Sequence, residues 1–344
     1  MKKSLWLLVI LLALLLVFTA CANDQPAEQP AEETPADTSA ETPADTPKET
    51  QRLIMATGGT SGTYYAFGGA LAQIINAESD YINITVNASG ASAENVQLIG
   101  AGDVQLAILQ NDVMDYAYHG TNTWEGKPVV TNMSTLCSLY PEVCQLIVAA
   151  DSGISSVADL AGKRISVGDV GSGVETNAMQ IMAAYGLSFD DIKMENLSFA
   201  ESAEAVKDRT IDGFFATSGV PNTAVLDLQT SRDVKLISLD QDKIDSLIAE
   251  YPFYAQIDIT NADYSFLGAD EKIATVAVQA TLICPPDMDT ELAYDIVKAI
   301  FDNAEAITNA HAKGAYLSPD YAVQGVSIDF HPGARQYFEE AGAL

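Results

Sequence analysis

The sequence of 344 residues has few basic residues, few cysteines and few histidines. It contains 17 lysines and arginines against 47 aspartates and glutamates, which gives a formal net charge of −30. Phosphate backbones and anionic lipid surfaces repel so acidic a protein, which excludes nucleic-acid binding. The four cysteines are too few for a disulfide framework, and His119, His311 and His331 lie far apart without HExxH or CxxC spacing. The sequence therefore predicts no metal site.

Enzyme motifs are absent as well. The glycine-rich segments do not match G-x-S-x-G, G-x-G-x-x-G or the P-loop pattern, and no nucleophile shares a recognisable motif with a histidine. We therefore expect neither a cofactor nor an enzymatic activity. A surface hydrolase would require a serine or aspartate site that these patterns do not describe.

The N-terminus has the features of an export signal. Residues 1–20 begin with two lysines and continue with an apolar run, and they end in Phe-Thr-Ala before Cys21. This ending is similar to the lipobox of bacterial lipoproteins, which implies that Cys21 is acylated. The alternative, an uncleaved anchor, is short for a membrane span. Residues 21–50 are rich in proline, alanine and acids, and they predict a disordered tether. We expect a protein held by lipid at the outer face of the cell membrane.

From residue 51 the pattern alternates between short apolar runs and amphipathic segments, which predicts parallel strands covered by helices. The first series comprises strands at 52–56, 82–87 and 104–109, with helices at 64–75, 91–100 and 112–118. A second series begins with the strand 144–150. A long strand at 273–284 returns the chain to the first unit, before helices at 291–311 and 332–341. We therefore expect two α/β lobes: lobe I from 51–146 plus about 276–344, and lobe II from about 147–275.

Three glycine-rich turns are candidate ligand sites: residues 57–63, 168–176 and 216–222. Glycine lets the backbone approach a ligand, and hydroxyls with free amides at a helix start form an anion site. A single turn of this kind is more often a helix cap. Their distribution over both lobes favours a shared cleft, suited to a solute with two acidic groups or with one acidic and one polar end.

Other polar residues flank these turns. Because adjacent helical residues point about 100° apart, at most one of Tyr64 and Tyr65 faces the cleft. Glu142 lies in a Tyr-Pro-Glu segment read as the loop before strand 144–150, where it either meets a ligand ammonium or is a solvated loop acid. Cys137 and Cys144 either form a bridge across that turn or are separately buried thiols.

Six segments together carry a specific resemblance. They are Leu53–Tyr65, Leu139–Glu142, Val167–Thr176, Asp212–Pro221, Tyr251–Tyr254 and His331–Ala334. In this order and spacing they resemble the TAXI family, the extracytoplasmic solute receptors of one class of tripartite ATP-independent periplasmic (TRAP) transporter. The resemblance covers about residues 52–342.

The resemblance implies a type II periplasmic-binding-protein fold, two α/β lobes joined by crossing hinge strands with the ligand cleft between them. It implies a solute of the glutamate, glutamine or 2-oxoglutarate class and a partner permease driven by an ion gradient. The implied ligand-binding residues are Gly59, Thr60, Ser61, Tyr64, Gln110, Asn111, Tyr140, Glu142, Gly171, Ser172, Gly173, Glu175, Thr176 and Gly219. A solute-sensing lipoprotein that reports to a membrane sensor kinase is the alternative, and a neighbouring permease gene would decide for transport.

Overall fold

The computed structural model describes residues 48–344. The predicted signal peptide (1–20), the predicted lipidated Cys21 and the predicted tether up to residue 47 lie outside the described residues. Within 48–344, no helix has both the length and the apolar character needed to cross a membrane.

The first lobe alternates strand and helix, as predicted. Its elements in chain order are β1 (Gln51–Ala56), α1 (Thr63–Glu78), β2 (Ile82–Asn87), α2 (Ser92–Ala101), β3 (Leu106–Gln110), α3 (Asn111–His119) and the short helix η1 (Asn122–Trp124). β1 pairs in parallel with both β2 and β3. Phe67, Leu71 and Ile75 recur every four residues along α1 and are fully buried, which fixes this helix against the sheet.

The second lobe repeats the same alternation. Its elements are η2 (Val157–Leu160), β5 (Arg164–Ser166), α4 (Gly173–Ala184), η3 (Phe189–Asp191), β6 (Lys193–Glu195), α5 (Phe199–Lys207), β7 (Gly213–Ser218), α6 (Thr223–Ser231), β8 (Val234–Leu236), α7 (Gln241–Glu250) and β9 (Ala255–Thr260). β5 pairs in parallel with β6 and β7. Sequence analysis did not predict α7 and β9. α7 buries only Ile244 and Leu247, so its apolar periodicity is weak.

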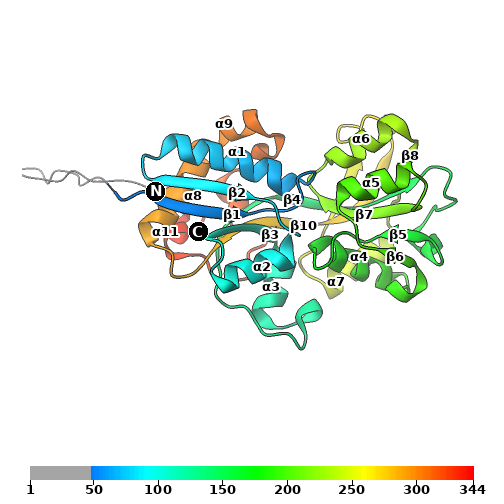
Figure 1. Ribbon diagram of the computed structural model, residues 1–344, viewed down its shortest axis with the longest axis horizontal. Coiled ribbons are helices and arrows are strands. Elements are labelled where there is room, and N and C mark those ends of the chain that lie inside the picture. The colour runs from blue at the N-terminus through cyan, green and yellow to red at the C-terminus, as the bar shows by residue number, and fades with distance from the viewer. Residues whose placement is uncertain (1–47) are drawn as a thin grey trace, which may run out of the picture. The chain divides into compact units, whose positions relative to one another are not determined.

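Two long strands, β4 (Ser134–Ala149) and β10 (Lys272–Cys284), pass through both lobes (Figure 1). They pair with each other in antiparallel fashion and lie at the centre of one sheet with the order β2-β1-β3-β10-β4-β7-β5-β6. β8 pairs with β4, and β9 pairs with β10. The sheet is therefore mixed, not parallel as expected, because the crossing strands run against their neighbours. The predicted lobe boundaries at 146 and 276 fall inside these two strands.

The structure corrects the prediction for the Tyr-Pro-Glu segment. Residues 140–142 were expected in a loop before a strand at 144–150, but β4 is continuous from Ser134 to Ala149. Pro141 favoured the loop because proline cannot donate a ladder hydrogen bond. The strand tolerates it beside a register shift, where Ala280 of β10 pairs with Tyr140 and Thr281 pairs with Ser138.

Cys137 and Cys144 lie on this same strand and are both free and buried. Seven residues of extended chain separate them by roughly 23 Å, which is beyond the reach of a disulfide. Of the two alternatives from the sequence, the separately buried thiols are confirmed. Burial raises the pKa of both thiols; it is the sole cause for Cys137, whereas the nearby Asp112 and Glu142 charges also raise the pKa of Cys144 and its hydrogen bond with Thr217 lowers it.

The C-terminal helices return to the first lobe and cover its sheet. They are α8 (Thr290–Asp302), α9 (Ala304–Ala310), η4 (Ala312–Tyr316), α10 (Pro319–Ala322) and α11 (Pro332–Glu340). The single helix predicted over 291–311 is divided at Asn303. Lys48 joins the start of the described chain to α8 through ion pairs of 2.9 Å with both Glu291 and Asp295.

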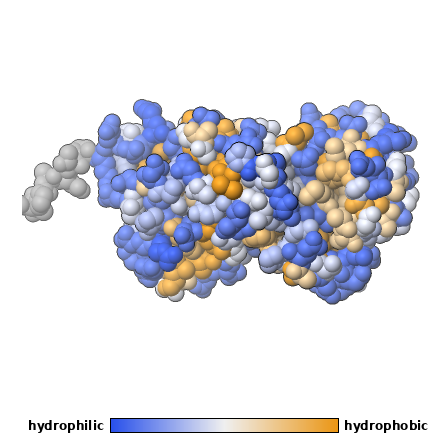
Figure 2. All heavy atoms as spheres, turned by 90° about the horizontal axis from the view of Figure 1, so that it is seen from below, coloured by the Kyte–Doolittle hydropathy of each residue, from blue (hydrophilic) through white to orange (hydrophobic). Residues whose placement is uncertain are grey.

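Each lobe has its own apolar core. Phe67 and Phe338 belong to the core of the first lobe, and Phe214 and Phe215 belong to cores of the second. The surface in Figure 2 is mostly hydrophilic, with apolar residues distributed over both lobes, and it narrows between them. The lobes are therefore separate packing units that share β4 and β10.

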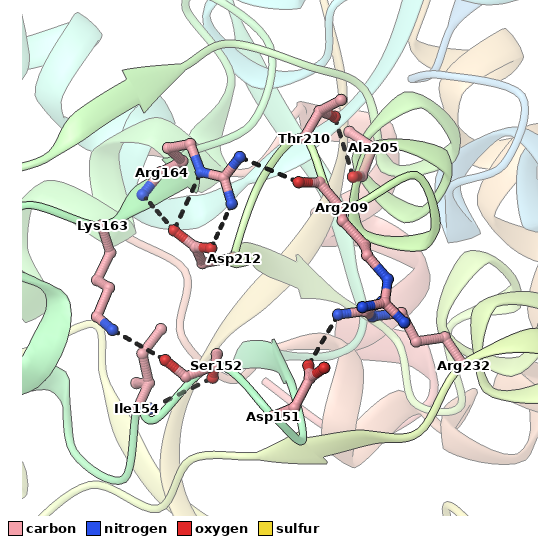
Figure 3. Close-up of polar contacts among 10 residues, drawn as sticks. All are labelled: Asp151, Ser152, Ile154, Lys163, Arg164, Ala205, Arg209, Thr210, Asp212 and Arg232. Atoms are coloured by element: carbon pink, nitrogen blue, oxygen red, sulfur yellow. Dashed lines mark hydrogen bonds and ion pairs between the residues drawn. The ribbon is translucent and has the colours of Figure 1, made fainter.

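Figure 3 shows a group of paired charges in the second lobe. They lie near the end of β4 and the start of β7, on the side of this lobe away from the first lobe. The Arg164 guanidinium donates to both carboxylate oxygens of Asp212, at 2.6 and 3.3 Å, and to the carbonyl oxygen of Arg209. Arg232 pairs with Asp151 at 2.8 Å. We call this group the distal ion pairs. The first pair fastens β5 to the segment before β7, and the second fastens the loop after β4 to the segment before β8.

Candidate functional site

A cavity of about 50 Å³ lies between the lobes, where α1, α2, α4 and α5 begin. The first lobe and β4 contribute Gly58, Gly59, Ser61, Gly62, Thr63, Tyr64, Ala91, Ser92, Gln110 and Glu142 to its lining. The second lobe contributes Asp169, Ser172, Gly173, Val174, Ser198, Phe199, Thr217 and Ser218. All three glycine-rich turns singled out in the sequence, at 57–63, 168–176 and 216–222, therefore contribute residues to one cavity. Its volume holds a few water molecules or one small solute.

Of the residues expected to bind ligand, the structure brings one group together in this cavity. The group is Gly59, Ser61, Tyr64, Gln110, Glu142, Ser172 and Gly173. Tyr64 is buried and reaches the cavity while Tyr65 is exposed, in agreement with the prediction that at most one of the two faces the cleft. The glycines and hydroxyl side chains of the turns named in the sequence were thus sufficient to predict much of the cavity lining.

The structure places the remaining candidates elsewhere. Thr60 is exposed beside the cavity. Asn111 holds the backbone by donating to the Gly325 carbonyl at 2.9 Å and accepting from the Gln279 amide at 3.0 Å. The Tyr140 ring is fully buried and packs against Phe67, with ring centroids 5.1 Å apart. The side chains of both residues therefore support the first lobe from inside.

Three further candidates belong to a second, more open hollow on the other side of the 168–176 turn. Gly171, Glu175 and Thr176 line it, and the Glu175 carboxylate accepts from the Gly171 amide at 2.8 Å. Gly219 lies at the edge of the lobes, where its carbonyl oxygen is 3.5 Å from the Thr63 hydroxyl. Glu175 therefore shapes the turn that presents Ser172 and Gly173.

Sequence reasoning missed several lining residues. Ser198 and Phe199 come from the start of α5, and Ser92 comes from the start of α2. Thr217 and Ser218, at the end of β7, belong to the predicted turn 216–222, although they were not among the named ligand-binding residues. A signal existed for Ser198, because the Ser-x-x-Glu pattern with Glu201 is a capping box, and the structure forms it. The other residues reach the cavity only through the arrangement of the lobes.

Glu142 lies at the cavity with its carboxyl group removed from water. The residue is 2 % exposed, which overturns the alternative of a solvated loop acid, and the Tyr64 hydroxyl donates to its Oε2 atom. Burial raises the pKa of Glu142 well above its usual range, although the Tyr64 hydrogen bond opposes this shift. Burial and the nearby Glu142 charge likewise raise the pKa of Tyr64. If the Glu142 carboxyl group is ionised, it requires a positive charge nearby. The surrounding side chains have only a weak influence of this kind.

The cavity lining within residues 48–344 includes no lysine, arginine or histidine. Its second acid, Asp169, has a raised pKa because of burial and the neighbouring Glu201 and Glu94 charges. The buried Lys313 lies behind Gly219 and has only the smallest influence on Glu142. The carboxyl groups of Glu142 and Asp169 therefore have no basic side chain in the described lining to neutralise them.

The starts of four helices at the cavity wall are a source of partial positive charge, in contrast to the carboxyl groups. α1 begins after Gly62 and α2 after Ala91, and neither residue caps its helix with a side chain. By contrast, the Ser172 and Ser198 hydroxyls accept from backbone amides of α4 and α5. Free amides in the first turn of α1, with no acid in that turn, form a partial positive charge that suits a carboxylate.

The two lobes touch each other across the cavity. The Ala93 amide of α2 donates to the Gly171 carbonyl at 3.1 Å, and the Gln110 amide group donates to Asn177 of α4 at 3.1 Å. Gly173 lies so close to Gln110 that a Cβ atom there would be 1.8 Å from its side-chain oxygen. That oxygen is buried and has no hydrogen-bond partner within residues 48–344. The structure thus shows the lobes in a closed arrangement.

Two α/β lobes, two crossing strands and a cavity between the lobes define the type II fold of periplasmic solute-binding proteins, as the sequence predicted. The chain belongs to the NMT1-like family, whose family model matches residues 55–342. A protein from Bordetella bronchiseptica RB50 has a similar structure, with 15 % identity, a TM-score of 0.50 and coverage of 85 % of this chain and 82 % of that one.

Two further solved structures show similarity at comparable identity. The alkanesulfonate-binding protein SsuA of Xanthomonas axonopodis pv. citri, bound to MOPS, is 15 % identical, with a TM-score of 0.48 and coverage of 85 % of both chains. A putative L-cystine ABC transporter protein of Listeria monocytogenes is 14 % identical, with a TM-score of 0.49 and coverage of 77 % of this chain and 95 % of that one.

Proposed function

We propose that this protein is the extracytoplasmic solute-binding lipoprotein of a TRAP transporter. It captures a small carboxylate solute of the glutamate, glutamine or 2-oxoglutarate class and delivers it to an ion-gradient-driven permease. The closed cavity between two lobes of the type II fold supports a binding role, and the sequence signatures support the TAXI branch. The observation that carries the proposal is that the buried Glu142 carboxyl and the uncapped start of α1 line the same cavity.

Within this solute class, the charges favour glutamate or glutamine over 2-oxoglutarate. Burying the Glu142 carboxylate without a counter-charge is costly, and the ammonium group of an amino acid supplies that charge on binding. A dicarboxylate would bring two negative charges into a cavity that lacks basic side chains. The ammonium therefore binds at Glu142.

The solute carboxylate binds at the start of α1. The backbone amides after Gly62 and the hydroxyl of Ser61 lie at the cavity, and no acid in the first helical turn opposes them. A helix start contributes about 0.3–1 kcal/mol to such an interaction. Since micromolar affinity requires roughly −8 kcal/mol, the Glu142 ion pair, the hydroxyls and the enclosure by both lobes supply most of the binding free energy.

Solute binding then favours the closed form of the receptor. Ligand contacts made with both lobes at once are available only when the lobes meet, so the solute shifts the population toward closure. Bending of β4 near residue 146 and of β10 near residue 276 accommodates this motion. The permease recognises the closed form, and the lipid on Cys21 keeps the receptor at the membrane surface.

Isothermal titration calorimetry with L-glutamate, L-glutamine, 2-oxoglutarate and succinate tests the proposal. We expect the two amino acids to bind and the two dicarboxylates to bind at least tenfold more weakly. The Glu142→Gln variant keeps the shape of the side chain but loses its charge, so its affinity for glutamine falls roughly thirtyfold or more, as for a broken buried charge pair. Thr60→Ala, at an exposed hydroxyl beside the cavity, is the matched control.

The outcome also separates the parts of the proposal. If none of the four solutes binds, the receptor function for this class is wrong. If 2-oxoglutarate binds more tightly than glutamate, the role of Glu142 is wrong while the receptor function stands. Membrane fractionation of the Cys21→Ser variant tests the anchor separately, and we expect this variant to lose acylation and leave the membrane fraction.

A further inference from the structure

We propose that closure of the lobes takes up a proton at Asp112, so that the receptor holds its solute more tightly at acidic pH and releases it as the pH rises. The inference rests on the proposed function, since it assumes that a solute drives closure. Asp112 is not a lining residue of the cavity and serves no role in the solute contacts described above.

Asp112 lies in the contact between the lobes. It is 1 % exposed, in the first turn of α3, two residues beyond Gln110 at the cavity. Its Oδ1 atom accepts from the Val113 amide at 2.8 Å, and its Oδ2 atom accepts from the Asn177 side chain of α4 at 3.0 Å. The first contact is within the first lobe, whereas the second crosses to the other lobe and exists only when the lobes are closed.

The network around this carboxyl group is uncharged. Asn177 also accepts from Gln110 at 3.1 Å and contacts the Tyr254 hydroxyl at 2.9 Å. Tyr254 in turn donates to Gln180 of α4 at 2.5 Å, and Gln180 donates to the Tyr116 hydroxyl of α3 at 3.1 Å. Amides and phenols satisfy hydrogen bonds between the lobes, but they do not neutralise a buried negative charge.

The titratable groups that face Asp112 give it no counter-charge. On α3 they are Asp115, which pairs with the half-exposed His119 at 3.2 Å, and the Tyr116 phenol. β4 contributes Glu142 and the Cys144 thiol, and the segment before β9 contributes Tyr254. α4 contributes only neutral side chains, Asn177 and Gln180. The buried Lys313 influences Glu142 and does not rank among the influences on Asp112.

Burial therefore raises the pKa of Asp112 to about 7 in the closed form, against the opposing effect of its hydrogen bonds from Val113 and Asn177. When the lobes separate, the Asn177 contact is lost and water reaches the carboxyl group, so its pKa returns toward roughly 4. Between these values the closed form holds a proton that the open form lacks. Closure is then most favoured at low pH, and this advantage is lost as the pH rises to about 7.

The pH dependence of solute affinity tests the inference, with L-glutamine as the probe because its own groups do not titrate between pH 5 and 7. We expect the affinity of the full-length protein in detergent to fall by roughly tenfold per pH unit over this window and to level off above it. Calorimetry at pH 6 in two buffers of different ionisation enthalpy should report about one more proton taken up per glutamine bound than in Asp112→Asn, a difference that cancels any proton that Glu142 releases when it pairs with the solute ammonium.

Three variants identify the group that takes up the proton. Asp112→Asn keeps the size of the side chain without titrating, although its amide group can accept only one of the two hydrogen bonds. We expect it to bind glutamine with about one proton fewer taken up and without the fall in affinity toward pH 7. Asp115→Asn, on the same helix but outside the contact with Asn177, should retain the uptake of the unmodified protein. Glu142→Gln should also retain it, with weaker binding overall, which separates the cavity carboxyl from the interface carboxyl.

Proton uptake by Asp112→Asn equal to that of the unmodified protein would overturn the inference. If that variant does not fold, Glu142→Gln decides the question, because Glu142 cannot exchange a proton there: binding of glutamine by Glu142→Gln without proton uptake would overturn the inference. An absence of glutamine and glutamate binding at every pH would instead contradict the proposed function.

Discussion

The distal ion pairs and the cavity use charge in opposite ways. At the end of the second lobe, Arg164 and Asp212 meet at 2.6 Å, with side chains that are partly exposed to water (Figure 3). At the cavity and the contact between the lobes, Glu142 and Asp112 are buried and have only neutral hydrogen-bond partners. Paired surface charges fasten local structure at little cost. Buried and unpaired carboxyls are costly for stability, and such groups cluster at functional sites.

The comparison shows where this acidic chain places its few basic residues. Several of them are used at the distal end, as Lys163, Arg164, Arg209 and Arg232, and none of the described lining of the cavity is basic. In the proposed function the cation for Glu142 comes from the solute, and in the further inference a proton removes the charge of Asp112. Both acids thereby become sensitive to what enters the cleft.

The largest effect is expected where the lobes meet. Gly173→Ala places a Cβ atom 1.8 Å from the Gln110 side-chain oxygen, so the lobes cannot close without moving a buried, hydrogen-bonded side chain. Overpacking of this kind costs about 1–3 kcal/mol, which lowers solute affinity roughly tenfold to hundredfold with the fold intact. Calorimetry measures the affinity, and small-angle scattering measures ligand-induced compaction.

Gly59→Ala is the matched control for this variant, because a Cβ atom at Gly59 would meet nothing within 4 Å although the residue also lines the cavity. Equal affinities in the two variants would show that contact at Gly173 is unnecessary for binding.

A smaller effect is expected from a single hydroxyl of the cavity. Ser61→Ala removes a lining hydrogen-bonding group near the start of α1 and should weaken binding about fivefold, equivalent to roughly 1 kcal/mol. The neighbouring Thr60→Ala should change nothing, because Thr60 is exposed and outside the lining. A loss of affinity in Thr60→Ala equal to that in Ser61→Ala would place the solute outside this cavity.

The smallest effect on solute binding is expected at the distal end. Burial raises the pKa of Asp212, but the hydrogen bonds and charge of Arg164 outweigh this, so that its net pKa lies below the usual value. Since the folded-state pKa is lowered, the pair contributes stability at neutral pH that is lost as the pH falls below about 4. Asp212→Asn should lower Tm by a few degrees at pH 7, with little change at pH 3 and with unaltered affinity.

Acid thus removes the stability contributed by the distal pair, whereas acid favours closure of the lobes and with it the solute-bound form. Thermal unfolding monitored by circular dichroism, at both pH values and in 1 M salt, measures the contribution of the distal pair. Salt should reduce it, because the pair is exposed. A change in solute affinity in Asp212→Asn would couple the two regions and remove the contrast between them.

Local patterns in the sequence predicted much of the fold. The alternation of strand, glycine-rich turn and helix located β1 to α3, and the strand predicted at 273–284 corresponds to β10. The turns at 57–63 and 168–176 were identified because glycines, hydroxyls and helix starts are adjacent in sequence. Features of this kind depend on neighbouring residues, so they are visible without a structure.

The rest depended on contacts between distant segments. Pro141 is a local signal against a strand, but the pairing of β4 with β10 and β7 overrides it. The burial of Glu142 follows from that pairing and from the packing of Tyr64 above it. The contact of Asp112 with Asn177 joins residues that are 65 positions apart. No periodicity or motif indicates such a meeting.

A crystal structure of the protein with L-glutamate or L-glutamine tests the central claim most directly. The account predicts the solute between the lobes, with its ammonium nitrogen within about 3.2 Å of a Glu142 carboxylate oxygen and a carboxylate at the first turn of α1. A solute carboxylate at Glu142, or a solute bound outside this cavity, would contradict it.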